Sequence, residues 1–268
     1  MEKGGLRPKV LTIAASDPTS GAGIQADIRT IALLRAHPLC CVTAITIQST
    51  TQVKGVYPLP VDLIRSQVEA VLSDGTPQAV KIGMLYDEGI VELVSQLIEE
   101  YGLRNVVLDP LFLSSTGQLL TTRGAYKLLA KRLLPAVQVI TPNGYESIAL
   151  LRELDPQGFG KMDSPESLSK KLIAERLKDY GPHVLITGGD LDGRDLLLDE
   201  RGFYEIAFDP IGTKNTHGTG CVFSSALATY LAFGFDLRKA FRYAKIFVVS
   251  RISLGYPIGK GHGVLGLP

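Results

Sequence analysis

The sequence predicts an α/β fold with a mostly parallel sheet and helices on both of its faces. Short runs rich in β-branched residues alternate along the chain with longer stretches in which apolar residues recur at helical spacing. Most strand-like runs lie singly between helical stretches, which is the pattern of parallel strands joined by crossover helices. No linker, low-complexity tract or internal repeat divides the 268 residues. We therefore expect one domain over residues 1–268.

The first half of the chain reads as five strands and four helices. The run Val10-Leu11-Thr12-Ile13-Ala14 has the composition of a buried strand. After it, apolar residues follow at spacings of four, three and three, the period of one helix face, at Ile24, Ile28, Ile31 and Leu34. The same criteria place strands at 40–47, 79–82, 105–109 and 137–140, and helices at 21–35, 61–72, 88–101 and 122–134.

The second half adds more helices, one strand and a hairpin. Two short strand patterns, 195–198 and 203–208, flank the turn Asp199-Glu200-Arg201-Gly202 and predict the hairpin. The remaining elements are a strand at 183–186 and helices at 146–153, 164–178, 220–232 and 237–254.

Composition and charge exclude several classes of protein. The chain has 28 Lys and Arg against 27 Asp and Glu, a net charge of +1, which argues against a dedicated nucleic-acid or anionic-membrane binder. The hydrophobic content of 45% supports a sizeable core, and three cysteines, two of them adjacent, are no disulfide framework. The first apolar run is too short for a signal peptide. Residues 215–235 lack Asp, Glu, Lys and Arg, but their polar, glycine-rich start favours a buried helix over a membrane span, so we expect a cytoplasmic protein.

Polar residues and glycines directly follow many of the predicted strands. In an open parallel sheet, ligands bind at the carboxyl ends of the strands, where these residues would meet. The first candidates for a site are therefore Asp17, Gln48, Gly83, Met84, Asp109, and the segments 141–143 and 187–189.

The segment Gly21-Ala22-Gly23-Ile24-Gln25-Ala26 matches the glycine pattern of dinucleotide-binding loops. That fingerprint also needs an acidic residue about 20 positions later, whereas no Asp or Glu occurs between Asp27 and Asp62. We interpret the segment as a substrate loop whose glycines allow close approach of the backbone, with a plain helix-starting turn as the alternative. Lys214 precedes the C-terminal glycines, so a Walker-type phosphate loop is not supported either.

The segment Asn215-Thr216-His217-Gly218-Thr219-Gly220-Cys221 is the strongest local signal. Its glycines directly precede a long apolar helix, so free N–H groups and the positive helix end would form an anion hole around residues 218–220. Cys221 falls in the first helical turn, where we expect a lowered thiol pKa and a chemical role. The alternative for Cys221 is a small buried apolar residue. His217 either lines the pocket or stabilises the turn.

Carboxylates follow two neighbouring strands. Asp109 closes the strand at 105–109, and Glu146 follows the strand at 137–140. Taken alone, each can be a helix cap, and Asn143 with Glu146 has the spacing of a capping box. Mg²⁺ takes one or two carboxylates together with phosphates and waters, so two acids on one sheet edge beside an anion hole suggest a magnesium site.

Five segments, in this order, resemble the hydroxymethylpyrimidine and phosphomethylpyrimidine kinases of thiamine biosynthesis. That family has the ribokinase-like fold, a three-layer α/β/α arrangement with a mostly parallel central sheet, which is shared by pyridoxal kinases. The joint match of the first and last segments is highly specific. The segments are ASDPTSGAGIQAD at 15–27, KIGML at 81–85, VVLDP at 106–110, ITPN at 140–143 with Glu146, and TKNTHGTGC at 213–221.

The resemblance implies ATP- and Mg²⁺-dependent phosphorylation of 4-amino-5-hydroxymethyl-2-methylpyrimidine and, in most members, of its monophosphate. It implies a homodimer whose other partners are small molecules. It implies a pyrimidine pocket lined by Asp17, Gly23, Gln48 and Met84, where the Gln48 amide can both donate and accept. It implies an anion hole and a catalytic base formed by Gly218, Thr219, Gly220 and Cys221. The residues implied for the nucleotide are Asn143, Thr187, Lys214 and Lys245, and those implied for Mg²⁺ are Asp109 and Glu146.

One departure from the family leaves the activity open. Thr187-Gly188-Gly189-Asp190 stands where the family usually has Lys-Gly-Gly-His, so a phosphate-contacting lysine is missing. The missing lysine motivates one alternative, a non-catalytic pyrimidine-binding protein. A pyridoxal kinase of the same fold is the other alternative, because some pyridoxal kinases share the glycine turn. Gln48 and Met84 favour the pyrimidine over pyridoxal, and the retained Cys221 and Glu146 favour catalysis.

Overall fold

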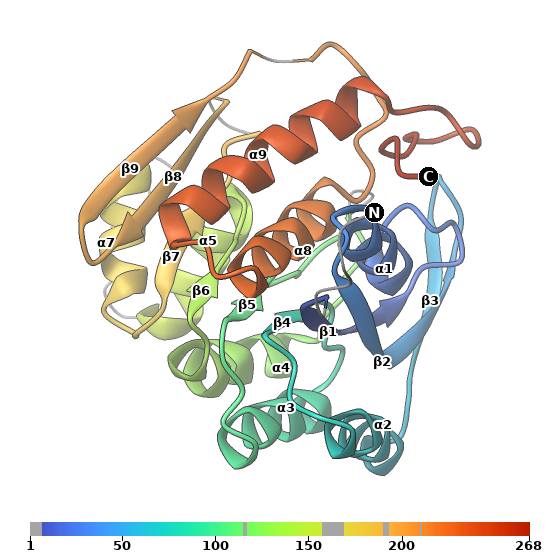
Figure 1. Ribbon diagram of the computed structural model, residues 1–268, viewed down its shortest axis with the longest axis vertical. Coiled ribbons are helices and arrows are strands. Elements are labelled where there is room, and N and C mark those ends of the chain that lie inside the picture. The colour runs from blue at the N-terminus through green and yellow to red at the C-terminus, as the bar shows by residue number, and fades with distance from the viewer. Residues whose placement is uncertain (1–6, 115–116, 157–168, 190–192, 210) are drawn as a thin grey trace.

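The computed structural model describes residues 7–114, 117–156, 169–189, 193–209 and 211–268. These residues form a nine-stranded sheet in the order β3-β2-β1-β4-β5-β6-β7-β8-β9 (Figure 1). The strands from β2 to β7 in this order are parallel, whereas β3 at one end and β8 and β9 at the other pair antiparallel. The strands are β1 Lys9–Ser16, β2 His37–Gln48, β3 Val53–Pro58, β4 Ala79–Ile82, β5 Val106–Leu108, β6 Val139–Ile140, β7 His183–Ile186, β8 Arg194–Asp199 and β9 Gly202–Ala207.

Helices cover both faces of the sheet, which gives the expected three layers (Figure 1). One hydrophobic core lies under α1, α8 and α9, and the other lies under α2, α3, α4, α5 and α7. Successive side chains of β1 show the division, because Val10 belongs to the first core and Leu11 to the second. The helices are α1 Gly23–Leu33, α2 Val61–Ser73, α3 Glu88–Glu100, α4 Arg123–Leu128, α5 Gly144–Leu154, α7 Lys170–Lys178, α8 Thr219–Ala232 and α9 Leu237–Ser253.

The differences from the predicted elements are local. The sequence analysis has no strand at β3, because Lys54 and Gly55 interrupt its apolar pattern; β3 is an edge strand, where lysine is common. The helix predicted for 122–134 stops as α4 at Leu128 and continues as a π-helical turn, Leu129–Leu133, and a 3₁₀ turn, Leu134–Ala136. Positions 164–168 of another predicted helix lie outside the described residues.

Helix α8 is buried against the central strands β1, β4 and β5 of the sheet. Its N-cap is Gly218, and its buried residues include Cys221, Val222 and Phe223. The prediction of a buried helix in this apolar stretch is therefore confirmed. In the part of the chain that the structure describes, no helix combines the length and the apolar character needed to cross a bilayer.

Candidate active site

The loop after β1 and the turn before α8 meet through a side-chain hydrogen bond. The Asp17 carboxylate accepts from Nε2 of His217 at 2.9 Å. It also accepts from the backbone N–H groups of Thr19 at 2.9 Å and Ala22 at 3.0 Å. Burial raises the pKa of Asp17, but the hydrogen bonds from His217 and Thr19 outweigh this effect and hold the pKa below its usual value. In the structure, Asp17, which we predicted to contact the substrate, fastens two loops together.

Two glycines let these loops pack backbone against backbone. Gly23 has a φ of +59°, and a Cβ atom on it would lie 2.5 Å from the carbonyl oxygen of Ala15. Gly218 has a φ of +86°, and a Cβ atom there would collide with the carbonyl group of Gly21. Both positions therefore require glycine, and the close approach that we expected at Gly23 is made to the chain itself.

The Cys221 thiol lies at the start of α8 and is only 4% exposed. Burial raises its pKa to about 12. The Lys81 ammonium and a backbone hydrogen bond from Gly23 lower the pKa in part, whereas the carboxylates of Asp109 and Asp27 raise it further. The predicted lowering of this pKa is therefore wrong for the structure, because burial and two acidic neighbours outweigh the helix start.

Asp109 lies beside Cys221 just after β5 and is 2% exposed. Its carboxylate accepts from Oγ of Ser224 at 3.2 Å and from the Cys221 thiol. Burial raises its pKa to about 6, although Lys81 favours the ionised form. A buried carboxylate with two weak donors suits a bound cation, so Asp109 fits the predicted magnesium role.

The structure also contains a buried ion pair between Lys81 and Asp27, which was not predicted from the sequence. Nζ of Lys81 lies 2.9 Å from each carboxylate oxygen of Asp27, and both side chains are 0% exposed. Hydroxyl groups of Thr12 and Ser225 donate to the same carboxylate at 2.6 and 2.7 Å. The available signal was a lysine inside the otherwise apolar strand β4, together with an acidic residue on the apolar helix α1.

The other two predicted pocket residues lie close to this loop pair. Gln48 ends β2, and its Nε2 atom is 3.4 Å from Nε2 of His217. Because Nε2 of His217 carries the proton that it donates to Asp17, it cannot also accept from the Gln48 amide N–H, so Gln48 is a close neighbour rather than a hydrogen-bond donor to His217. Met84 is buried and packs against Ala15. The hollow bounded by Gln48 and His217 measures about 10 Å³, which leaves hardly any room for a single water.

Asn143 and Glu146 form the capping box that the sequence analysis gave as the alternative to a metal site. Oδ1 of Asn143 accepts from the Glu146 N–H, and Oε2 of Glu146 accepts from the Asn143 N–H, both at 2.9 Å. The box starts α5 at the carboxyl end of β6. Among the described residues, no group of three His, Cys, Asp or Glu side chains is arranged to hold a metal ion. Cation binding here would thus depend on Asp109 together with the phosphates of a bound nucleotide.

Another buried carboxylate, Asp195, joins Lys245, which was predicted for the nucleotide, to the turn that follows Thr187. Asp195 on β8 accepts from the backbone N–H of Gly188 at 2.9 Å and lies 2.7 Å from Nζ of Lys245 on α9. Thr187 is tied in turn to the segment before α5, because its N–H donates to the carbonyl of Pro142 at 3.0 Å. Asp195 was not predicted as a site residue, because it lies in an apolar strand and no local sequence pattern marks it. Of the remaining predicted residues, Lys214 is exposed and Asp190 lies outside the described part.

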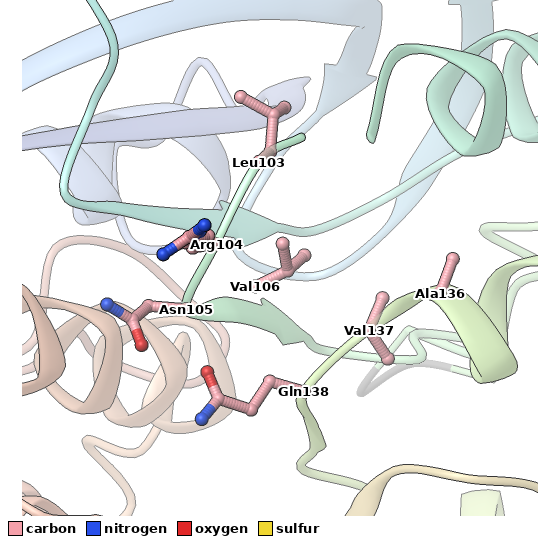
Figure 2. A pocket seen from close by; sticks show the side chains of 7 residues that line it. All are labelled: Leu103, Arg104, Asn105, Val106, Ala136, Val137 and Gln138. Atoms are coloured by element: carbon pink, nitrogen blue, oxygen red, sulfur yellow. The ribbon is translucent and has the colours of Figure 1, made fainter. Parts of the chain in front are cut away.

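A second hollow lies elsewhere on the molecule. It measures about 380 Å³ and is open to solvent at the amino ends of β5 and β6 (Figure 2). Its apolar lining comes from Leu103, Val106, Ala136 and Val137, and Arg104, Asn105 and Gln138 carry its polar groups. None of the predicted site residues lines this hollow, so it is not the site described above.

Comparison with known proteins decides the family. The model of the phosphomethylpyrimidine kinase family matches residues 17–266. The chain belongs to this family. The hydroxymethylpyrimidine/phosphomethylpyrimidine kinase of Bacillus subtilis is 39% identical over 260 residues, which cover 95% of this chain and 93% of the relative. Other curated relatives are bifunctional thiamine biosynthesis proteins, and the chain spans about half of their length, 51% in one case.

Solved structures confirm the ribokinase-like fold of this family member. A phosphomethylpyrimidine kinase from Clostridium difficile superposes with a TM-score of 0.76 at 33% identity, covering 91% of this chain and 98% of that one. A pyridoxal kinase from Staphylococcus aureus in complex with ADP superposes with a TM-score of 0.84 at 34% identity, covering 97% and 93%. The fold and the kinase class are therefore shared, and both substrate types occur among similar structures.

Proposed function

We propose that this chain transfers the terminal phosphoryl group of ATP to the hydroxymethyl group of 4-amino-5-hydroxymethyl-2-methylpyrimidine, and then phosphorylates the monophosphate, as a step of thiamine biosynthesis. The observation that carries the proposal is the meeting of the loop after β1 with the glycine turn before α8. There the backbone of Gly23 reaches the sulfur of Cys221, and Asp17 bonds His217. Family membership supplies the reaction class.

The start of α8 provides the electrostatic part of this reaction. The first N–H groups of a helix have no carbonyl partner one turn back, so those of Gly220 and Cys221 can bind phosphate oxygens. Phosphoryl transfer depends mainly on positioning and on stabilising charge, which such a site supplies. In the transfer, a bond forms from the hydroxymethyl oxygen to the terminal phosphorus while the bond from phosphorus to ADP breaks. We assign acceptance of the hydroxyl proton to Cys221, which can accept it only as the thiolate. Because burial raises the pKa of the thiol to about 12, the thiol must lose its own proton before the transfer.

We assign Mg²⁺ to Asp109 and the nucleotide to residues near the turn around Gly188. Asp109 would hold Mg²⁺, which supplies charge neutralisation on the phosphates. We assign Glu146 and Asn143 a supporting part, through water, at the start of α5. Lys245, Thr187 and Lys214 would lie along the nucleotide, and Asp195 keeps Lys245 beside the Gly188 turn. A cytoplasmic homodimer is part of the same proposal.

Pyridoxal kinase is the second candidate, because the similar Staphylococcus aureus structure is a pyridoxal kinase. Gln48 beside His217 supports the pyrimidine, since an amide can pair with the polar edge of an aminopyrimidine. Side-by-side turnover of the two substrates with Mg-ATP tests the choice. A higher kcat/KM for the pyrimidine supports the proposal, and a higher value for pyridoxal reverses it. ATP-dependent turnover of either excludes a purely binding protein.

A further inference from the structure

The ion pair between Lys81 and Asp27 is a costly feature to place in a protein core. Both side chains are 0% exposed, and the two groups lie 2.9 Å apart. Removing two charges from water carries a large desolvation penalty, and replacing a buried ion pair by neutral residues is often neutral or stabilising. Stability alone therefore does not explain why a buried ion pair is present at this position.

Four elements hold the pair in one position. Lys81 comes from β4 and Asp27 from α1, while Thr12 of β1 and Ser225 of α8 donate hydroxyl hydrogen bonds to Asp27. The Lys81 ammonium is also close to Gly83, where a Cβ atom would lie 2.8 Å from Nζ. The pair is thus fixed in position and fully shielded from solvent.

The ammonium group lies near the second turn of α8, because Asp27, which it contacts at 2.9 Å, accepts a hydrogen bond from Ser225 of that helix at 2.7 Å. It acts electrostatically on both Cys221 and Asp109, the two groups at the start of that helix. Ser225, which anchors Asp27, lies one helical turn beyond Cys221 on α8. The Asp27 carboxylate acts on the same two groups with the opposite sign, but the effect of Lys81 is the larger at both. A charge held in a buried region acts more strongly than the same charge at a surface.

We propose that Lys81 is a positioning residue for phosphoryl transfer, whose ammonium, anchored by Asp27, holds a fixed positive charge behind Cys221 and the start of α8. Negative charge gathers there as the hydroxymethyl oxygen attacks the phosphoryl group. The inference rests on the proposed function. Lys81 would not contact the substrate, so we expect its loss to lower kcat and to leave substrate binding nearly unchanged.

The test is a double variant, Lys81→Met with Asp27→Asn, which removes both charges and leaves neither side chain buried with an unpaired charge. We expect it to fold with a Tm within a few degrees of the wild type, to keep KM for the pyrimidine within about 3-fold, and to lose about 100-fold in kcat. Lys81→Gln with Asp27→Asn is the second version, which keeps hydrogen-bonding groups in place if the methionine variant does not fold. A matched control, Glu92→Gln with Arg132→Met, removes an exposed ion pair of 3.2 Å and should leave kcat unchanged.

The possible outcomes distinguish a failure of the proposed role of Lys81 from a failure of the proposed function. A folded double variant with kcat within about 3-fold of the wild type overturns the role of Lys81, because the pair is then only structural. A parallel loss of kcat in the surface control overturns it as well. If the wild-type chain itself transfers no phosphate to the pyrimidine, the proposed function fails instead.

Discussion

His217 and Asp17 lie 200 residues apart in the chain, yet the imidazole Nε2 is 2.9 Å from the carboxylate. The backbone N–H of His217 also donates to the carbonyl of Gly263, so both the main chain and the side chain of His217 are held in place. The bond fastens the loop that follows β1 to the turn that starts α8. It thereby fixes the distance between the proposed pyrimidine pocket and the proposed anion hole.

Loss of this bond should reduce turnover. We expect His217→Ala to lower kcat/KM for the pyrimidine by about 10- to 100-fold, because a misplaced loop costs orientation of the reacting groups. Steady-state kinetics measure the effect, and His37→Ala, at an exposed position of β2, is the control. Equal values for His217→Ala and the wild type would show that the contact has no part in positioning.

Cys221→Ala should lower kcat strongly and leave binding of the pyrimidine nearly unchanged. A proton acceptor in the transition state contributes about 10²- to 10⁴-fold, so kcat should fall by that factor while the Kd for the pyrimidine stays within about 3-fold. Calorimetry gives the Kd and a coupled ADP assay gives kcat. Cys40→Ser serves as control, because Cys40 is exposed in β2. An active Cys221→Ala enzyme would rule out the thiol as the base.

Asp109 should make the folded protein less stable as the pH rises. Its pKa goes from 3.8 to about 6 on folding, so between these values the folded state binds more protons than the unfolded state. The free energy of unfolding must then fall with rising pH in this window. Relative to the wild type, Asp109→Asn should gain about 1–3 kcal/mol between pH 4 and pH 7. Urea unfolding of both proteins at the two pH values checks this, and parallel pH profiles would contradict the burial argument.

Asp195 should govern affinity for the nucleotide rather than for the pyrimidine. Asp195→Asn weakens the link between Lys245 and the Gly188 turn, so we expect KM for ATP to rise about 10-fold with the pyrimidine KM unchanged. Kinetics with each substrate varied in turn give the two values. Arg242→Ala, at an exposed position of the same helix as Lys245, is the control. Equal changes in both KM values would show that Asp195 supports the fold as a whole and has no specific role at the nucleotide site.

Local patterns in the sequence predicted most of the fold and part of the site. The helical start at Cys221 and the capping box of Asn143 with Glu146 depend on neighbours within a few residues, so they can be read from the sequence. The thiol pKa depends on burial and on Asp27, which comes from a distant helix, so the local argument from the helix dipole gave the wrong direction. His217 with Asp17 and Lys245 with Asp195 are likewise pairs that only the folded topology brings together.

The proposed activity itself is tested most directly by counting phosphates on the product. The purified chain is incubated with Mg-ATP and equal concentrations of the hydroxymethylpyrimidine and pyridoxal, and the products are separated and identified by mass spectrometry. The account predicts pyrimidine monophosphate first and diphosphate later, with pyridoxal phosphate formed more slowly. Phosphorylation of pyridoxal alone, or no transfer to either compound, would contradict it.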